Sequence, residues 1–455
     1  MNTVLDEMIK KVPKAKKALL SKCKVMNNIT VGGLARKILE ALNTRNKRLR
    51  FYQKFIGLDL NADENKYNFI KKFKRGGISH CNQPGKHNET VVSYDITSQY
   101  PSAMIYMKIP AGKSQWVNEY NENWYGYYRI KNLSLQGKKF RPISYSCGGE
   151  SLNWSKNWKE EDELYIGSEL LKCMLEIEPF TFEVVEGLVS DSYVRGEDLF
   201  GTYVNTLFAE KAKEDVYKKN KDDRYNPAYR EVIKLLLNSL SGKLVEDPDR
   251  HKTLKVVAEN YQQNTLNGCG VRMERNEDFK MNKWIGCGCS VYDYSKTLLW
   301  DYVMCLPNGS DDVIHIETDS IYFNSKHQET FLDNVRNIHP VSDPDAFGIG
   351  KELGNMDQEH TSSGPSYFIG KKMYYLKDKD ESEAVKAKGV PFKTYDEYGN
   401  HVRLLDVSFY ERLYAGEAVK TVFSTLKKHL FPTPTITTSK MSRTTKALIK
   451  QKEWW

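Results

Sequence analysis

Two acidic positions in the sequence stand where strand-forming residues end. A run of β-branched and aromatic residues leads up to Asp95 and a Tyr-Pro pair follows, which predicts a strand ending in a carboxylate before a turn into a helix. Much later, two apolar runs flank Glu317-Thr318-Asp319-Ser320, which predicts a hairpin with carboxylates at its tip. Because Mg²⁺ takes oxygen ligands and is held by one or two carboxylates plus substrate phosphates, Asp95 and Asp319 are candidate ligands of a two-metal phosphoryl-transfer site.

A third stretch could supply positive charge for a triphosphate. Asn226-Pro227 is a favourable helix start, with an N-cap residue and Pro at the first helical position. A helix advances by about 100° per residue, which places four polar residues within an arc of about 80°: Arg230, Lys234, Asn238 and Ser241. The residues expected on the opposite, buried side are Val232, Leu235, Leu236 and Leu240.

Each of these features has an ordinary structural explanation when it is taken alone. Acids at strand ends often cap turns, and a basic helix face is often only solvated. With a basic helix between the two acidic stretches, the catalytic interpretation is favoured.

The three stretches together resemble motifs A, B and C of family B DNA polymerases, in the order and spacing of the protein-primed branch. Phe73-Lys74-Arg75-Gly76-Gly77 stands where that branch carries its Tyr-x-Gly-Gly linker. Lys372-Met373-Tyr374 matches the Lys-x-Tyr motif, and residues 385–390 resemble the strand that follows it. The resemblance extends from about residue 30 to residue 428. It implies an α+β right-hand polymerase fold with palm, fingers and thumb subdomains.

The resemblance also implies a role for each matching residue. Asp95 and Asp319 would be the catalytic metal ligands for two Mg²⁺ ions, with Mn²⁺ as an alternative, and Glu317 would be a third catalytic carboxylate beside them. The residues expected to contact the nucleotide are Tyr100, Arg230, Lys234, Asn238 and Ser241. Those expected to contact DNA are Arg75, Gly76, Gly77, Lys372, Tyr374, Lys386 and Lys388.

Four positions depart from the family pattern. Glu317 stands where motif C usually has its first Asp, and Ser241 stands where motif B usually has a Tyr that packs against the templating pair. Lys74 replaces the Tyr of the linker, and Gln99 replaces the usual Leu of motif A. We expect neither Lys74 nor Gln99 to touch the chemistry directly.

The spacing of the motifs divides the chain into segments. We expect a basic N-terminal segment without a complete exonuclease domain at 1–72, the linker and palm motif A at 73–104, an insertion resembling terminal-protein region 1 at 105–205, fingers with motif B at 206–245, an insertion resembling terminal-protein region 2 at 246–283, the palm with motif C and the Lys-x-Tyr segment at 284–395, and a thumb with a basic tail at 396–455. Two further helices are expected, an amphipathic one from Val31 to Leu42 and one from Tyr292 to Cys305.

The composition is that of a folded protein, and its modest positive charge suits a polyanionic partner. Of 455 residues, 40% are hydrophobic, and 68 Lys and Arg against 59 Asp and Glu give a formal net charge of +9. The eight cysteines lack zinc-site spacing, so we expect reduced thiols. No apolar run approaches the about 18 residues of a membrane span, so we expect a soluble protein in the cytoplasm, that of the host cell if a phage encodes it.

The predicted reaction is template-directed addition of deoxynucleotides to a hydroxyl, with template-primer DNA and deoxynucleoside triphosphates as partners. By resemblance, the setting is replication of a phage, linear plasmid or mobile element, with a terminal (priming) protein and an exonuclease in trans as further partners. Two rivals remain, an RNA-templated polymerase on the same palm and a degenerate polymerase kept as a DNA-binding or assembly subunit. The Glu-Thr-Asp-Ser hairpin argues against the first, and retention of Asp95, Asp319 and Lys234 argues against the second.

Overall fold

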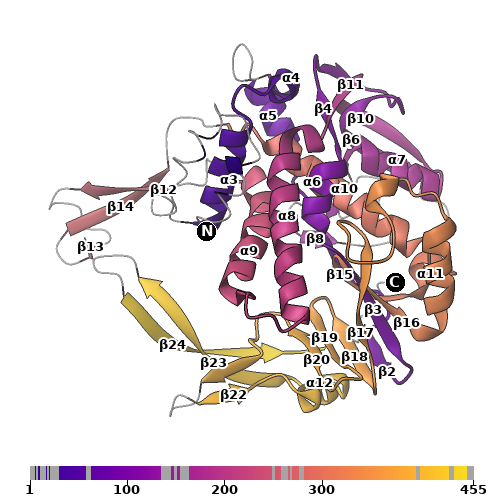
Figure 1. Cartoon of the computed structure of the whole chain (residues 1–455), viewed down its shortest axis with the longest axis vertical. Helices are drawn as coiled ribbons and strands as arrows, with labels where there is room; N and C mark the ends of the chain where they lie inside the picture. The colour runs from indigo at the N-terminus through magenta and orange to yellow at the C-terminus, as the bar shows by residue number, and fades with distance from the viewer. Residues whose placement is uncertain are drawn as a thin grey trace.

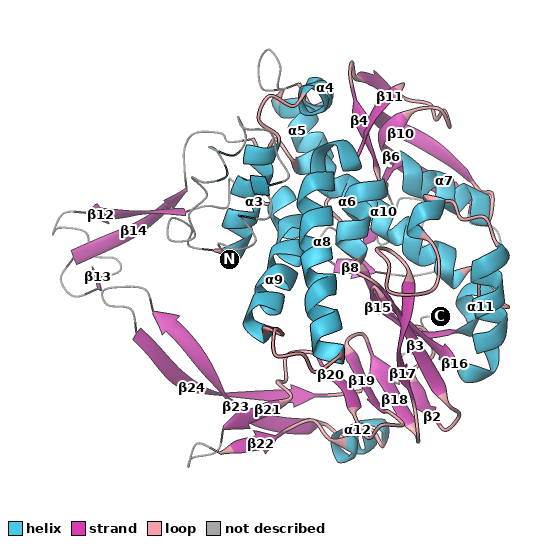
Figure 2. Cartoon of the chain, in the orientation of Figure 1, coloured by secondary structure: helices cyan, strands magenta, loops and turns pink. Residues whose placement is uncertain are grey.

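The computed structural model describes residues 30–57, 63–134, 163–247, 281–395, 400–429 and 435–447, with short strands between 145 and 153 and between 252 and 275 and isolated positions before residue 30. Figures 1 and 2 show the chain, which combines helices and strands throughout. Most of the basic stretch of the N-terminal segment and the last residues of the basic tail, including Lys450 and Lys452, lie outside the described residues.

A five-stranded antiparallel sheet forms the centre of the fold. Its antiparallel strands lie in the order β1 (Ile78–Cys81), β15 (Val313–Thr318), β16 (Ser320–Asn324), β3 (Val91–Ile96) and β17 (Met356–Thr361). Successive side chains of a strand point to opposite faces. One face carries Val92, Ile316 and Ile321 into the main hydrophobic core, and the other carries the polar residues of the site. The predicted strand that ends at Asp95 and the predicted hairpin with acids at its tip are both confirmed.

Helices cover the apolar face of this sheet. The central one, α10 (Ile285–Val303), is buried over nearly its whole length and packs against α6 (Gln99–Tyr106). The predicted helix began too late, at Tyr292. The first turns of α10 contain Gly286 and Gly288, and glycine is unfavourable inside a helix. Both glycines allow close packing here, since a Cβ on Gly288 would lie 2.4 Å from Val245 Cγ1. Beyond the sheet edge, α11 (Gln328–Asn337) packs on the aromatic rings of the core.

Two long helices, α8 (Glu197–Lys219) and α9 (Pro227–Leu244), run side by side across the front of the molecule (Figure 1). The Asn226 side chain accepts a hydrogen bond from Tyr229 N, so the predicted start of α9 is confirmed. The predicted wheel was wrong at two positions. Leu235 is 44% exposed and Ser241 is buried, because the buried arc of α9 is centred on Ile233, Leu237 and Leu244 and reaches Ser241 at its margin.

A second sheet packs on the polar face of the first. It has the order β2 (Gly85–His87), β18 (Ser366–Gly370), β19 (Met373–Lys377) and β20 (Glu383–Ala387), and α12 (Val407–Tyr414) covers its other face. Tyr322, Phe368 and Tyr374 form an aromatic cluster that joins the two sheets. The chain continues through β21 (Lys393–Tyr395) and β22 (His401–Arg403) into a long ribbon of β23 (Val419–His429) and β24 (Thr435–Thr445), drawn in yellow in Figure 1.

The range 105–205 contains a small sheet with its own core, and its two bounds fall within α6 and α8. Its sheet has the order β5 (Gln115–Val117), β10 (Thr181–Ser190), β6 (Tyr125–Ser134) and β9 (Leu164–Gly167), and α7 (Ser168–Ile177) packs on it. Two smaller pairs accompany this sheet, β4 (Lys108–Ala111) with β11 (Ser192–Arg195) and β7 (Tyr145–Cys147) with β8 (Ser151–Asn153). The range 246–283 contains the strands β12 (Lys252–Val257), β13 (Thr265–Leu266) and β14 (Cys269–Arg275), which project on the left of Figure 1.

Three helices precede the central sheet: α3 (Val31–Leu42), α4 (Lys47–Phe55) and α5 (Glu64–Lys71). The bounds of α3 confirm the amphipathic helix predicted from Val31 to Leu42, and its buried face packs on α9. Within the described part of the chain, we find no helix whose length and apolar character would let it cross a bilayer.

Candidate active site

Two carboxylates meet on the polar face of the central sheet. The cross-strand register aligns Ser320 with Asp95, and Ile96 N donates to Asp319 O at 2.8 Å, so the end of β3 lies against the turn between β15 and β16. Burial and the charges around them raise the pKa of Asp95 to about 8 and that of Asp319 to about 6. The fold has therefore brought together the two acids that the sequence singled out.

The turn that carries Asp319 is strained. Thr318 has φ 65°, which a β-branched residue rarely adopts, and Asp319 N donates to Glu317 O at 2.8 Å across it. These contacts describe a γ-turn centred on Thr318. Backbone strain of this kind persists only where the surroundings hold it, and it is concentrated at functional sites.

A third carboxylate near the pair escaped the sequence analysis. Glu359 lies at a bulge of β17, where the register with β3 shifts between Gln358 and His360. Its charge contributes to the raised pKa values of both Asp95 and Asp319. A β-bulge turns a side chain out of the regular alternation, and no feature of the surrounding sequence marks its position.

Glu317 lies near Asp319, and its negative charge helps to raise the pKa of Asp319, but its carboxylate contacts β1 and the second sheet. Its Oε2 accepts a hydrogen bond from Ser79 Oγ at 2.9 Å, and its Oε1 lies 3.4 Å from Lys372 Nζ. Although burial alone would raise the pKa of Glu317, the nearby His315, whose Nε2 lies 3.7 Å from Oε2, and the charge of Lys372 hold it below its usual value. Glu317 thus connects motif C to the lysine of the Lys-x-Tyr segment.

Cations of the helix pair lie across from the carboxylates. Lys211 of α8 donates from Nζ to Ser98 Oγ at 3.2 Å, next to the end of β3. Burial lowers the pKa of Lys211, and the charges of Arg230 and Lys234 lower it further while that of Asp95 raises it. Lys211 is therefore close enough to interact with Arg230, with Lys234 and with Asp95. Arg230 also pairs with Asp215, with 2.5 Å between Nε and Oδ1.

Lys211 is a candidate residue that the sequence analysis missed. Its own stretch of α8 is rich in both acids and lysines, so no local pattern distinguishes it from neighbours such as Lys213. Only the packing of α8 against α9 and the start of α6 shows which lysine faces Asp95. Of the predicted residues on α9, Lys234 and Asn238 are exposed, while the Ser241 hydroxyl is turned inward and donates to Asn238 O at 3.0 Å.

Tyr100 and the glycine linker meet at the same turn. A Cβ on Gly77 would lie 2.7 Å from Thr318 Cγ2 and 3.0 Å from the Tyr100 hydroxyl, so only glycine fits between them. The Tyr100 ring packs edge-on against Tyr292 at 5.5 Å, and burial raises the pKa of Tyr100 to about 12. The ring is therefore held rigidly between the linker and α10.

The other predicted DNA contacts are spread over the linker and the second sheet. Arg75 lies over the Tyr165 ring, 5.9 Å from its centroid, and its backbone oxygen accepts from Lys296 Nζ at 2.7 Å. The next residue, Gly76, is exposed. Lys386 and Lys388, at the end of β20, are exposed as well. Lys386 is close enough to lower the pKa of Asp319.

The tyrosine of the Lys-x-Tyr segment does not reach the surface. Tyr374 is buried beneath the hairpin, where it packs on His315 and Tyr322. Lys372, two residues earlier, is partly exposed and has φ 57°. Lys372 thus provides a cation beside Glu317, and the Tyr374 ring packs against the strands of motif C.

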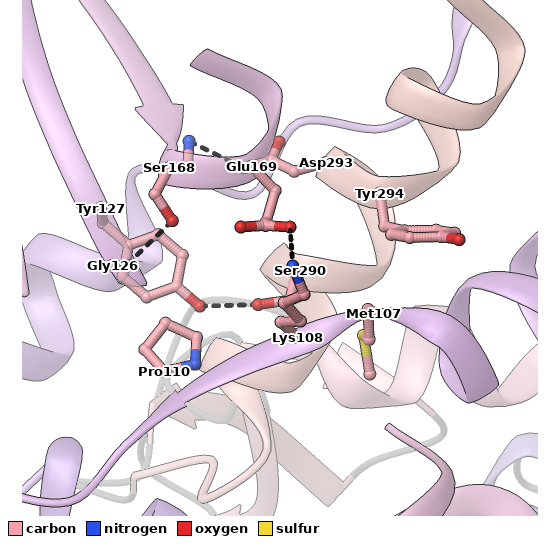
Figure 3. A pocket seen from close by; sticks show the side chains of 11 residues that line it. Met107, Lys108, Pro110, Gly126, Tyr127, Ser168, Glu169, Ser290, Asp293 and Tyr294 are labelled. Atoms are coloured by element: carbon pink, nitrogen blue, oxygen red, sulfur yellow. Dashed lines mark hydrogen bonds and ion pairs between the residues drawn. The ribbon is translucent and has the colours of Figure 1, made fainter. Parts of the chain in front are cut away.

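A separate small pocket lies where the 105–205 unit joins α10 (Figure 3). Tyr127, Glu169 and Ser290 line it, the Tyr127 hydroxyl lies 3.2 Å from Ser290 Oγ, and Lys108 pairs with Glu169. Behind it, Asp293 Oδ2 accepts a hydrogen bond from Gly167 N at 2.9 Å. The lining residues do not include any of the candidate catalytic residues, so we interpret this pocket as part of a structural junction.

The carboxylate pair suits divalent cations. Asp95 and Asp319 offer oxygen donors only, and their mutual repulsion in a buried place is relieved by a cation between them. Among the described residues, no three His, Cys, Asp or Glu side chains converge to form a metal site by themselves. Such a donor set fits Mg²⁺ ions whose remaining ligands are water and substrate phosphates.

Comparisons with known proteins agree with this arrangement. Residues 3–336 match the family described as DNA polymerase type B, organellar and viral. A probable DNA polymerase of Neurospora intermedia is 24% identical over 380 residues, covering 75% of this chain and 35% of the relative. A probable DNA polymerase of Ascobolus immersus is 24% identical over 349 residues, covering 70% of this chain and 26% of the relative. The chain therefore spans about a third or less of the length of these two curated relatives.

The fold is similar to solved structures of Phi29 DNA polymerase. The complex with primer-template DNA and incoming nucleotides superposes with a TM-score of 0.63 at 18% identity, covering 95% of this chain and 70% of that one. The complex with single-stranded DNA has a TM-score of 0.56 at 19% identity, covering 82% and 62% of the two chains. The fold is the right-hand polymerase fold, and the chain belongs to the organellar and viral type B DNA polymerases.

Proposed function

We propose that this chain is a DNA-directed DNA polymerase that adds deoxynucleotides by two-metal phosphoryl transfer. The observation that carries the proposal is the placement of the buried Asp95–Asp319 pair opposite the cations Lys211, Arg230 and Lys234. Negative groups that hold metal on one side and positive groups on the other leave a place for a triphosphate between them.

The chain's own residues would each perform a distinct part of this reaction. Asp95 and Asp319 would hold two Mg²⁺ ions, whose positive charge would favour attack by the primer hydroxyl and departure of pyrophosphate. Lys234 and Lys211 bind the triphosphate oxygens, while Arg230 lies near them with its guanidinium paired to Asp215. Mn²⁺ takes the same oxygen ligands and serves as an alternative ion.

Template and primer would contact the linker and the second sheet. Arg75 and the exposed Gly76 directly precede Gly77, which packs against Thr318. Lys372, Lys386 and Lys388 belong to the second sheet or its loops. Contacts with cations neutralise phosphates, and the backbone of a glycine allows DNA to approach closely. Asn238, exposed on α9, would lie near the nascent base pair.

We further propose that the physiological reaction is primed by a protein. The support is the resemblance of the ranges 105–205 and 246–283 to terminal-protein regions, together with membership of an organellar and viral family. A terminal protein is the partner that this proposal requires.

Primer extension tests the proposed activity. The chain is incubated with a labelled primer, Mg²⁺ and four deoxynucleoside triphosphates, on a DNA template and on an RNA template of the same sequence. We expect extension on DNA and loss of it in the Asp95→Asn variant. Extension only on RNA would support an RNA-templated enzyme. DNA binding without extension, both with Mg²⁺ and with Mn²⁺ in its place, would support the degenerate assembly subunit instead.

A further inference from the structure

Gln99 is a buried amide that touches two functional elements. It is the first residue of α6, and its side chain is 3% exposed. Its Nε2 donates to Thr318 O at 3.2 Å and to Ser295 O at 3.1 Å, so one amide connects the motif C turn to α10. Burying an amide costs free energy that only its hydrogen bonds offset, and the Oε1 of Gln99 has no partner among the described residues.

The bond to Thr318 O acts on the backbone that carries Asp319. The peptide group before the Asp319 Cα ends in Thr318 O, which accepts from Gln99, and the peptide group after it ends in Asp319 O, which accepts from Ile96 N at 2.8 Å. Both peptide planes that flank the Asp319 Cα are thus fixed by donors from the segment that also carries Asp95. With both planes fixed, the direction of the Asp319 Cα–Cβ bond is fixed as well.

This restraint is needed because the turn would otherwise relax. Thr318 has φ 65°, a conformation that is unfavourable for a β-branched residue and persists only where its surroundings hold it. The second acceptor of Gln99, Ser295 O, belongs to the buried helix α10 and provides a rigid reference point. The Gln99 amide therefore transmits the position of α10 to the turn.

We propose that Gln99 is a positioning residue that holds the Thr318–Asp319 turn so that the Asp319 carboxylate faces Asp95 and binds divalent cation. This inference rests on the proposed function, because the cation site is the one that the polymerase reaction uses. The required property of Gln99 is its N–H donor, so a side chain of similar size without that donor removes the effect.

The test compares the parent with Gln99→Leu and Gln99→Met, using Mn²⁺ binding and catalysis as separate readouts. Mn²⁺ binding is measured by electron paramagnetic resonance on the full chain with primer-template DNA and no nucleotide. We expect Gln99→Leu to weaken Mn²⁺ binding and to lower kcat for nucleotide addition, each by about tenfold, since small misplacements of catalytic groups cost up to about 10²-fold. KM for the nucleotide and Kd for DNA should stay within about twofold of the parent.

Asn43→Leu is the matched control. Asn43 is also 3% exposed, and its Nδ2 donates to two carbonyl oxygens, Leu39 O at 3.0 Å and Leu199 O at 2.8 Å, between α3 and α8. We expect it to lower Tm by an amount similar to Gln99→Leu without changing Mn²⁺ binding or kcat per folded molecule.

Three results separate the possibilities. Unchanged Mn²⁺ binding in folded Gln99→Leu or Gln99→Met overturns the positioning role, and so does an equal loss in Asn43→Leu. If Gln99→Leu does not fold, Gln99→Met, which keeps the length of the side chain without its donor, decides in its place. Loss of Mn²⁺ binding in a chain whose parent extends no primer supports the positioning role while overturning the proposed function.

Discussion

At the scale of single residues, the site depends on carboxylates that the sheet forces together at a free-energy cost. The raised pKa values of Asp95 and Asp319 record this cost, since burial disfavours the charged form of both acids, and the charges of Asp319 and Glu359 raise the pKa of Asp95 further. The arrangement is useful only if a cation takes the place of the proton.

The first prediction concerns these two acids. Asp95→Asn and Asp319→Asn should each reduce primer extension below about a hundredth of the parent rate, a loss of about 2.7 kcal/mol at the transition state. Binding of primer-template DNA should change little, because the acids hold metal and not DNA. Single-turnover extension and a DNA-binding titration check the two halves. A variant that retains a tenth of the parent rate would refute the ligand assignment.

The second prediction concerns Glu317, which lies beside the pair but turns toward Ser79 and Lys372. Glu317→Gln keeps an acceptor for Ser79 and removes the charge facing Lys372, so we expect a loss of extension rate smaller than about tenfold. Lys372→Met should cause a similar loss, and the double variant no further loss, because both changes remove one interaction. A loss as large as that of Asp319→Asn would show that Glu317 is itself a metal ligand.

The third prediction concerns sugar selection by Tyr100. The ring is held between Gly77 and Tyr292, which is the rigidity that steric exclusion of a 2′-hydroxyl requires. Tyr100→Val should raise ribonucleotide incorporation relative to deoxynucleotide incorporation, measured as the ratio of kcat/KM values. Tyr292→Leu removes the supporting ring and should raise the ratio less. An unchanged ratio in folded, active Tyr100→Val would mean that Tyr100 is only a core aromatic residue.

At the scale of elements, α10 connects the site to the rest of the chain. Lys296 Nζ donates to Arg75 O, and Asp293, 3.4 Å from Lys296 Nζ, accepts from Gly167 N. Their side chains are 3% and 8% exposed, and burial shifts the pKa of each toward its neutral form. One buried ion pair therefore holds both the linker and the 105–205 unit.

The fourth prediction separates the two tasks of this pair. Lys296→Met leaves the Asp293 charge buried without its partner and should cost about 3–5 kcal/mol of unfolding free energy. Adding Asp293→Asn removes that charge and keeps an acceptor for Gly167 N, so the double variant should regain most of the stability. DNA affinity should stay reduced in both variants, because neither can hold Arg75 O. Denaturant unfolding and a DNA titration measure the two effects, and full recovery of affinity in the double variant would contradict the linker role.

The sequence predicted the elements whose signals are local. Periodicity and the Asn226 cap predicted α9, and the apolar runs around Asp95 and Asp319 predicted the strands and the hairpin that carry them. What escaped prediction depends on tertiary packing. The bulge at Glu359, the choice of Lys211 among the lysines of α8 and the bonds of Gln99 all arise where separate elements meet. The exposed Leu235 shows the same limit, since a helical wheel gives the faces of α9 but not which neighbours cover them.

At the scale of the whole molecule, cations gather on the side of the second sheet that continues from the hairpin. Burial and then the charges of Lys388 and Lys372 lower the pKa of Lys371, which shows that these lysines lie close together. Lysines held close together favour binding of a polyanion, and the net charge of +9 has the sign that DNA binding requires. The long β23–β24 ribbon extends from the same end of the molecule (Figure 1).

The fifth prediction follows from this distribution and concerns the salt dependence of DNA binding. Each phosphate contact contributes about one unit to the slope of log K against log salt concentration. Replacing both Lys386 and Lys388 by Gln should therefore reduce the slope by about two while leaving the sequence preference unchanged. Lys326, exposed beyond the other end of β16, provides the control, and Lys326→Gln should leave the slope as it is. Lys234→Gln should also leave it unchanged but raise KM for the nucleotide, because that cation faces the triphosphate and not the duplex. A slope that falls in proportion to the charge removed, by about two in the double variant and about one in each single variant, would mean that DNA is attracted by net charge alone and does not lie along the second sheet.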